Sequence, residues 1–116
     1  MKEKKVASYL AGVCILLFSF PGLCFSDGGN RFWEFATDGP VVSSPALAGG
    51  YVYVGSDDTY VYCINAQAGV QEWKFKTDAA VQSSPVVADG CVYIGSNDRR
   101  LYCLNALTGE EKWSYA

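Results

Sequence analysis

The sequence predicts an all-β chain with two four-stranded antiparallel sheets and one leading strand. Tryptophan recurs at a spacing of 40 residues, at Trp33, Trp73 and Trp113. The segments 33–72 and 73–112 align without a gap, and 20 of their 40 positions are identical. Such self-similarity at a fixed period is the signature of a repeat architecture. Val, Tyr and Ile dominate the short runs between turn residues, and no helical period of apolar residues appears after residue 26.

The first element is a predicted secretory signal peptide at residues 1–26. Three lysines among residues 1–5 precede an uncharged apolar stretch at residues 6–20, which Pro21 and Gly22 interrupt. A secretory signal peptide typically has a positively charged segment, then an apolar segment, then small residues at the cleavage site. We expect cleavage after Ser26 or Cys24. An uncleaved anchor is the weaker alternative, because the stretch is shorter than the ~20 residues that a spanning helix needs. Lipoprotein processing is not expected, since large residues precede both cysteines of the segment, namely Val13 and Leu23.

Residues 27–116 form the predicted repeat region. A leading strand is expected at 32–36, and the two sheets at about 41–76 and 81–116. In the second sheet the strands are expected at 82–88, 91–96, 100–106 and 110–115. The segments between them contain Asp89-Gly90, Asn97-Asp98-Arg99 and Thr108-Gly109, which are residue types that suit chain reversals.

Apolar residues occupy both faces of the predicted strands. In the segments YVYV at 51–54 and YVYCI at 60–64, neighbouring residues point to opposite sides, yet both sets are apolar. In an antiparallel sheet with one solvent-exposed face, apolar and polar residues alternate along each strand. Both faces must therefore be covered, and a radial stack of four-stranded sheets, the β-propeller, meets that requirement.

Two stretches also resemble a known repeat. CINAQAGVQEW at 63–73 and CLNALTGEEKW at 103–113 resemble the PQQ-type repeat AxDxxTGxxxW, which builds the propellers of quinoprotein dehydrogenases and of BamB-like outer-membrane assembly factors. YVYVGSDD and CVYIGSND resemble the VYVGSxDG hairpin of the same family. The departures are Cys for Ala, Asn for Asp and, in the first copy, Ala68 for Thr. These exchanges keep a small side chain or the hydrogen bonds of the turn, so the blade assignment stands.

The resemblance covers residues 32–116 and implies two blades of an incomplete propeller. Propellers close with about four to eight blades. An isolated pair of blades would leave apolar end faces open to water, which predicts truncation, self-association or a longer repeat protein. The resemblance also implies blade-docking roles for the tryptophans beside conserved glycines. It pairs Trp73 with Gly69 and Trp113 with Gly109, and pairs Trp33 with a blade outside the chain.

The residue types favour no catalytic site. The chain has no His, which removes imidazole bases and His-ligated metals. Residues 27–116 carry six basic and eleven acidic side chains, a net charge of −5, so nucleic-acid binding is not expected. Their three cysteines are expected to be buried free thiols. The remaining polar candidates are expected to be solvated turns or architectural residues, namely Asp38, Asp78, Asp57-Asp58, Glu110-Glu111, Arg99-Arg100, Ser43-Ser44 and Ser83-Ser84.

The sequence therefore predicts an exported, non-catalytic repeat protein of the periplasm or cell surface, without catalytic, cofactor-binding or metal-binding residues. Its partners would be proteins, or copies of itself, that meet the open blade faces. After cleavage it would have no membrane span. Two alternatives stay open: a segment of a PQQ-dependent dehydrogenase, for which PQQ and calcium are implied by the resemblance alone, and a repeat cassette of a larger surface protein.

Overall fold

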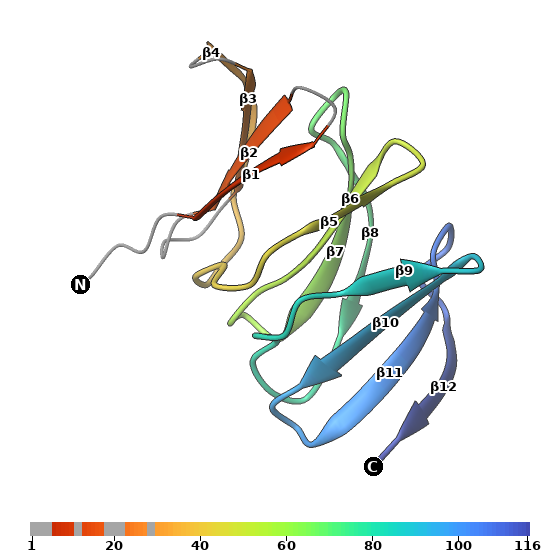
Figure 1. The fold of residues 1–116 in the computed structure, drawn as a ribbon. Coiled ribbons are helices and arrows are strands. Elements are labelled where there is room, and N and C mark those ends of the chain that lie inside the picture. Colours follow the sequence, from red (N-terminus) through yellow and green to blue (C-terminus); the bar gives the residue numbers. More distant parts are fainter. Residues whose placement is uncertain (1–5, 11–12, 18–22, 28–29) are drawn as a thin grey trace.

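The computed structural model describes residues 6–10, 13–17, 23–27 and 30–116, with side chains from Phe35 onward. Within these ranges the chain forms three four-stranded antiparallel sheets, which follow one another as a stack in Figure 1. No helix in the described residues is long and apolar enough to cross a membrane. The prediction of an all-β chain is confirmed.

The N-terminal sheet consists of β1 (Val6–Leu10), β2 (Val13–Leu17), β3 (Leu23–Asp27) and β4 (Asn30–Phe35) in that order. Strand β4 corresponds to the predicted leading strand, but it is paired with β3. Strands β1 and β2 lie within the predicted signal peptide, and β3 extends one residue past it. Short apolar runs of this kind suit a strand as well as an export signal. Removal of residues 1–26 stays a prediction, because the structure is that of the uncleaved chain.

The two repeats form the two sheets that the sequence predicts. The middle sheet has the order β5 (Ala46–Ala48), β6 (Tyr51–Gly55), β7 (Tyr60–Asn65) and β8 (Gln71–Lys76). The C-terminal sheet has the corresponding order β9 (Val86–Ala88), β10 (Cys91–Ser96), β11 (Arg100–Asn105) and β12 (Glu111–Tyr115). The bulge between β7 and β8 recurs between β11 and β12, 40 residues later.

Strand β9 is shorter than the predicted strand at 82–88. Pro85 has no N–H with which to extend the ladder. Upstream of it, the Ser83 hydroxyl donates to the carbonyl oxygen of Gly95 at 2.8 Å and accepts from the N–H of Gly95 at 2.9 Å. This side chain takes up the backbone groups that a longer strand would have paired, so only residues 86–88 join the sheet.

Both faces of the middle sheet are buried. One face carries Val52, Val54, Tyr62 and Ile64, and Phe35 of β4 packs against this cluster. The opposite face packs against the C-terminal sheet in a second cluster, made of Tyr53, Val61, Cys63, Trp73, Val81, Val92, Ile94, Tyr102, Leu104 and Ala106. Two-sided burial, the feature that predicts the propeller, is therefore observed in the middle sheet.

Hydrogen bonds at the sheet boundary fix the start of the second repeat. The N–H of Thr77 donates to the carbonyl oxygen of Thr59 at 2.8 Å, and the N–H of Val81 donates to that of Ser56 at 2.9 Å. The first strands of the two sheets, β5 and β9, also contact each other. The connecting segment is thereby held to the middle sheet, which places the C-terminal sheet face to face with it.

Candidate functional site

Trp73 of the middle sheet contacts the C-terminal sheet. It lies on β8 opposite Cys63 of β7 and is 8% exposed. Its indole N–H donates to the carbonyl oxygen of Ala106 at 3.1 Å, and the Tyr53 hydroxyl donates to the same oxygen at 3.0 Å. The two rings lie beside each other, with centroids 6.0 Å apart. Two side chains of one sheet thus share one backbone acceptor of the next.

Gly109 forms the surface on which the Trp73 indole lies. A Cβ at this position would come within 2.5 to 2.8 Å of three ring carbons of Trp73. The backbone φ of Gly109 is also +79°, a conformation that favours glycine. Trp73 therefore packs on the glycine of the following repeat, Gly109, for which the sequence predicts Trp113 as the partner.

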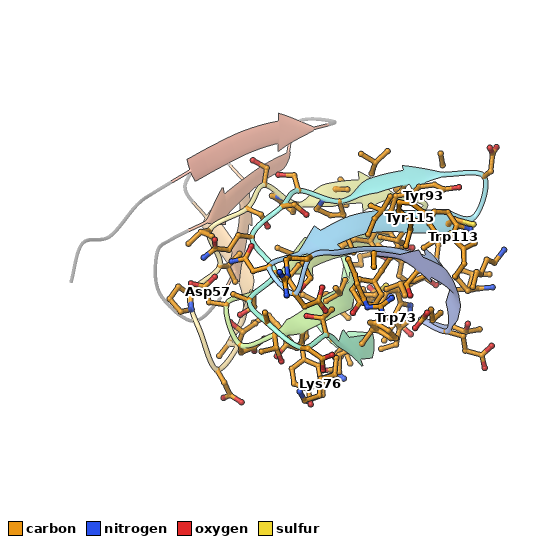
Figure 2. The ribbon with its side chains drawn as sticks, turned by 90° about the horizontal axis from the view of Figure 1, so that it is seen from below. Asp57, Trp73, Lys76, Tyr93, Trp113 and Tyr115 are labelled. Carbon is orange, nitrogen blue, oxygen red and sulfur yellow. The ribbon has the colours of Figure 1, made fainter. Side chains whose placement is uncertain are left out.

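The same residues recur on the outer face of the C-terminal sheet, where no further sheet of the described chain covers them. Tyr93 and Trp113 form a ring pair with centroids 6.1 Å apart, which repeats the geometry of Tyr53 and Trp73. Trp113, however, is 46% exposed, and Tyr115 is also exposed. Figure 2 shows Tyr93, Trp113 and Tyr115 gathered over this sheet. We call the surface formed by Val86, Tyr93, Leu101, Trp113 and Tyr115 the end face.

The other two predicted docking residues are Trp33 and Gly69. The side chain of Trp33 lies outside the described residues. Gly69 has a φ of +73°, and its N–H donates to the carbonyl oxygen of Asn65 at 2.8 Å, as that of Gly109 does to Asn105. Gly69 therefore closes the same type of turn as Gly109, and its pairing with a tryptophan stays a prediction.

The aspartates Asp58 and Asp98 have the same architectural role in the two repeats. In the second repeat, Asp98 accepts hydrogen bonds from the Tyr102 hydroxyl at 2.5 Å, the N–H of Asp78 at 3.1 Å and the N–H of Arg100 at 3.0 Å. Asp58 is bonded in the same way to Tyr62, Asp38 and Tyr60. Burial alone would raise the pKa of Asp98, but these hydrogen bonds outweigh it and lower the pKa. Each carboxylate ties a hairpin to the loop that precedes its sheet.

Three of the other polar candidates, Asp57, Arg100 and Ser84, form side-chain hydrogen bonds within the scaffold. Asp57 accepts from the Gln82 amide at 2.9 Å, and the Arg100 guanidinium donates to the Ser114 hydroxyl at 3.1 Å. Ser84 accepts from the N–H of Ser44 at 3.1 Å, whereas the buried hydroxyl of Ser43 has no hydrogen-bond partner among the described residues. In residues 35–116, no cluster of three or more acidic or cysteine side chains could hold a metal ion.

Cys63, Cys91 and Cys103 are buried free thiols, as the sequence predicts. Burial raises the pKa of Cys63 to about 12 and also raises the pKa of Cys103. A thiol rather than a thiolate is the stable form of both at neutral pH, and the thiol is a poor nucleophile. These two side chains act as small apolar residues of the sheets.

Comparison with known proteins identifies the family to which these sheets belong. The sequence profile of the family described as outer membrane protein assembly factor BamB, a PQQ-type repeat family, matches residues 23–116. The chain belongs to this family. No curated protein matches the chain in sequence. The profile begins at Leu23, the first residue of β3.

Solved structures show the same propeller fold. BamB from Moraxella catarrhalis superposes with a TM-score of 0.86 at 14% identity, over 100% of this chain and 37% of its own. Quinohemoprotein alcohol dehydrogenases from Pseudomonas putida and Comamonas testosteroni give TM-scores of 0.83 and 0.82 at 23% and 24% identity, over 94% and 95% of this chain. The chain spans about a third of the BamB chain and 20% of each dehydrogenase.

Proposed function

We propose that this BamB-family chain is an exported, non-catalytic β-propeller module that holds protein partners in the cell envelope. The observation that carries the proposal is the end face, where the tryptophan of an aromatic pair is exposed, whereas the corresponding pair of the first repeat is buried between two sheets. Exposed apolar patches of this kind are typical of protein interaction sites.

The use of the polar side chains supports a non-catalytic role. The carboxylates of Asp58 and Asp98 each accept three hydrogen bonds from the scaffold, and burial raises the pKa of the Cys63 and Cys103 thiols. A catalytic acid, base or nucleophile needs a group that is free to react and whose pKa suits the reaction. The envelope location is supported by the predicted signal peptide and by the assembly factor that names the family.

Photo-crosslinking in intact cells tests this proposal. A photoreactive amino acid replaces Leu107, which is 73% exposed in the turn between β11 and β12, and a matched chain carries it at the buried Val92. We expect defined adducts with envelope proteins from position 107 and none from position 92. A cytoplasmic location, or no adduct from position 107, would contradict the proposal. So would alcohol-dependent dye reduction by the purified chain supplied with PQQ and calcium.

A further inference from the structure

We infer that Cys91 and Cys103 form a cross-strand pair of thiols that is oxidised reversibly to a disulfide. The inference goes beyond the proposed function and rests on it at one point only, which is the supply of an oxidant, because disulfides form and persist in exported proteins. It is carried by the places of the two cysteines in the C-terminal sheet and by a comparison with the first repeat.

The pairing of β10 with β11 brings both thiols to one face of the sheet. Cys103 lies directly opposite Tyr93, and Cys91 precedes Tyr93 by two residues in the same strand. Residues two apart in a strand point to the same side, so Cys91 and Cys103 are diagonal neighbours. Trp113 lies opposite Cys103 on the other side, and its ring pairs with that of Tyr93. The two cysteines are therefore buried within the end face, beside its aromatic pair.

The two thiols also act on each other. Burial raises the pKa of Cys103, and hydrogen bonding with Cys91 and the charge of Cys91 raise it further. Both cysteines act on Tyr93 as well, and the charge of Cys91 is the largest cause of the raised pKa of this tyrosine. The sulfur atoms are thus close enough to interact, and a bond between them needs only a small approach of the two strands.

The first repeat contains a single thiol at the corresponding place. Cys63 is the counterpart of Cys103, but Tyr51 stands where the second repeat has Cys91. Cys63 belongs to the core between the middle and C-terminal sheets. The chain therefore carries its own reference, because Cys63 shares the position and the burial of Cys103 but has no neighbouring cysteine at position 51. We expect Cys63 to stay a thiol under conditions that oxidise the pair.

Cys91 is the thiol that an oxidant reaches first. It is the first residue of β10, directly after the exposed turn residues Asp89 and Gly90, and it is 7% exposed against 1% for Cys103. The Cys91 thiolate attacks a disulfide of the oxidant, which releases one thiol and leaves a mixed disulfide. The Cys103 thiolate then attacks Sγ of Cys91 and releases the second thiol. Two electrons and two protons pass to the oxidant, which ends as two thiols.

The diagonal placement predicts a bridge that is easily reduced. Disulfides usually join Cα atoms about 4.4–6.8 Å apart, whereas diagonal neighbours in a sheet are typically about 7–8 Å apart. Closing the bond therefore draws β10 and β11 together and strains the pair. Strained disulfides have more oxidising potentials than structural ones and are the labile ones. The pair is thus suited to a reversible change of redox state rather than to permanent crosslinking.

Oxidation of the purified chain with glutathione disulfide tests the inference. Remaining thiols are alkylated with iodoacetamide in urea, and tryptic peptides are analysed by mass spectrometry without reduction. Trypsin leaves the cysteines on separate peptides, with Cys63 in 32–74, Cys91 in 77–99, Cys103 in 101–112, and both cysteines of the predicted signal peptide in 6–31.

We expect the peptides 77–99 and 101–112 to be linked, with a mass two hydrogens below their sum, and Cys63 to be alkylated. The oxidised chain should keep the far-UV circular dichroism of the reduced chain. An excess of reduced glutathione should then return both peptides to the alkylated form. Cys91→Ser is the matched control, in which Cys103 should be alkylated, and Cys63→Ala should leave the linked pair unchanged.

Four results would overturn the inference. These are the absence of linked peptides from the oxidised chain, a link from Cys91 or Cys103 to a different cysteine, loss of the sheet signal on oxidation, and a bridge that reduced glutathione leaves intact. The third would mean that the bond forms only in unfolded chains, and the fourth that it is a permanent crosslink. None of them bears on crosslinking to envelope proteins, so the proposed function and this inference can fail independently.

Discussion

Replacement of Gly109 by Ala tests whether the contact between indole and glycine holds the two repeat sheets together. The new Cβ would lie 2.5 to 2.8 Å from the ring of Trp73, at a φ of +79°. The left-handed backbone costs roughly 1–2 kcal/mol for a residue with a Cβ. Overpacking against a buried ring adds about 1–3 kcal/mol. We therefore expect the free energy of unfolding to fall by about 2–5 kcal/mol.

The matched control is Gly90→Ala, because Gly90 has a φ of +76° and a Cβ there would meet nothing within 4 Å. Both variants carry the backbone cost, and both gain the same small stabilisation from a less flexible unfolded chain. Urea unfolding followed by far-UV circular dichroism measures the difference, which isolates the indole contact at about 1–3 kcal/mol. Equal losses in the two variants, with unchanged m-values, would refute the docking role of Gly109.

Three further predictions follow from the hydrogen bonds and burial described above. Trp73→Phe removes the indole N–H that bonds to Ala106 together with part of a buried ring, and should cost about 1–3 kcal/mol in urea unfolding, whereas no loss would show that neither contributes to stability. The pKa of Asp98 is lowered in the folded state, so its carboxylate stabilises the fold fully above the usual pKa of 3.8. This contribution is lost as the pH falls through the folded pKa. Asp98→Asn should therefore make the free energy of unfolding depend less on pH in the acid range. The Cys63 thiol, with a pKa of about 12, should resist iodoacetamide at pH 8 until urea unfolds the chain, and rapid alkylation of the native protein would contradict its burial.

The middle and C-terminal sheets could be predicted because their cause is visible in the sequence, whereas the apolar run that forms the N-terminal sheet is predicted as a signal peptide. The 40-residue period and the apolar residues on both faces of segments such as 51–54 indicate strands that are covered from two sides. Asp58 and Asp98 occupy equivalent positions of the repeat, and their hydrogen bonds are indeed repeated. A period in the sequence therefore predicts which contacts recur, even where it does not reveal what they are.

The docking partners could not be predicted from the period. A repeat places a glycine before and after each tryptophan, and only the direction of the Trp73 side chain decides that it packs on Gly109. The acceptor at Ala106 is a backbone oxygen, so no side chain marks it in the sequence. The shortened β9 depends on the hydroxyl of Ser83, whose choice of backbone partners is settled only when the neighbouring hairpin is in place.

The carbonyl oxygen of Ala106 has a consequence for how the fold comes apart. Both of its lone pairs are engaged by side chains of the middle sheet, while the N–H of the same residue donates to the carbonyl oxygen of Gly90 at 2.9 Å. The two peptide groups that flank the Cα atom of Ala106 thus join its own sheet to the neighbouring sheet. Local fraying of this turn would have to break bonds in both directions at once, so the two repeats should open as a single cooperative unit.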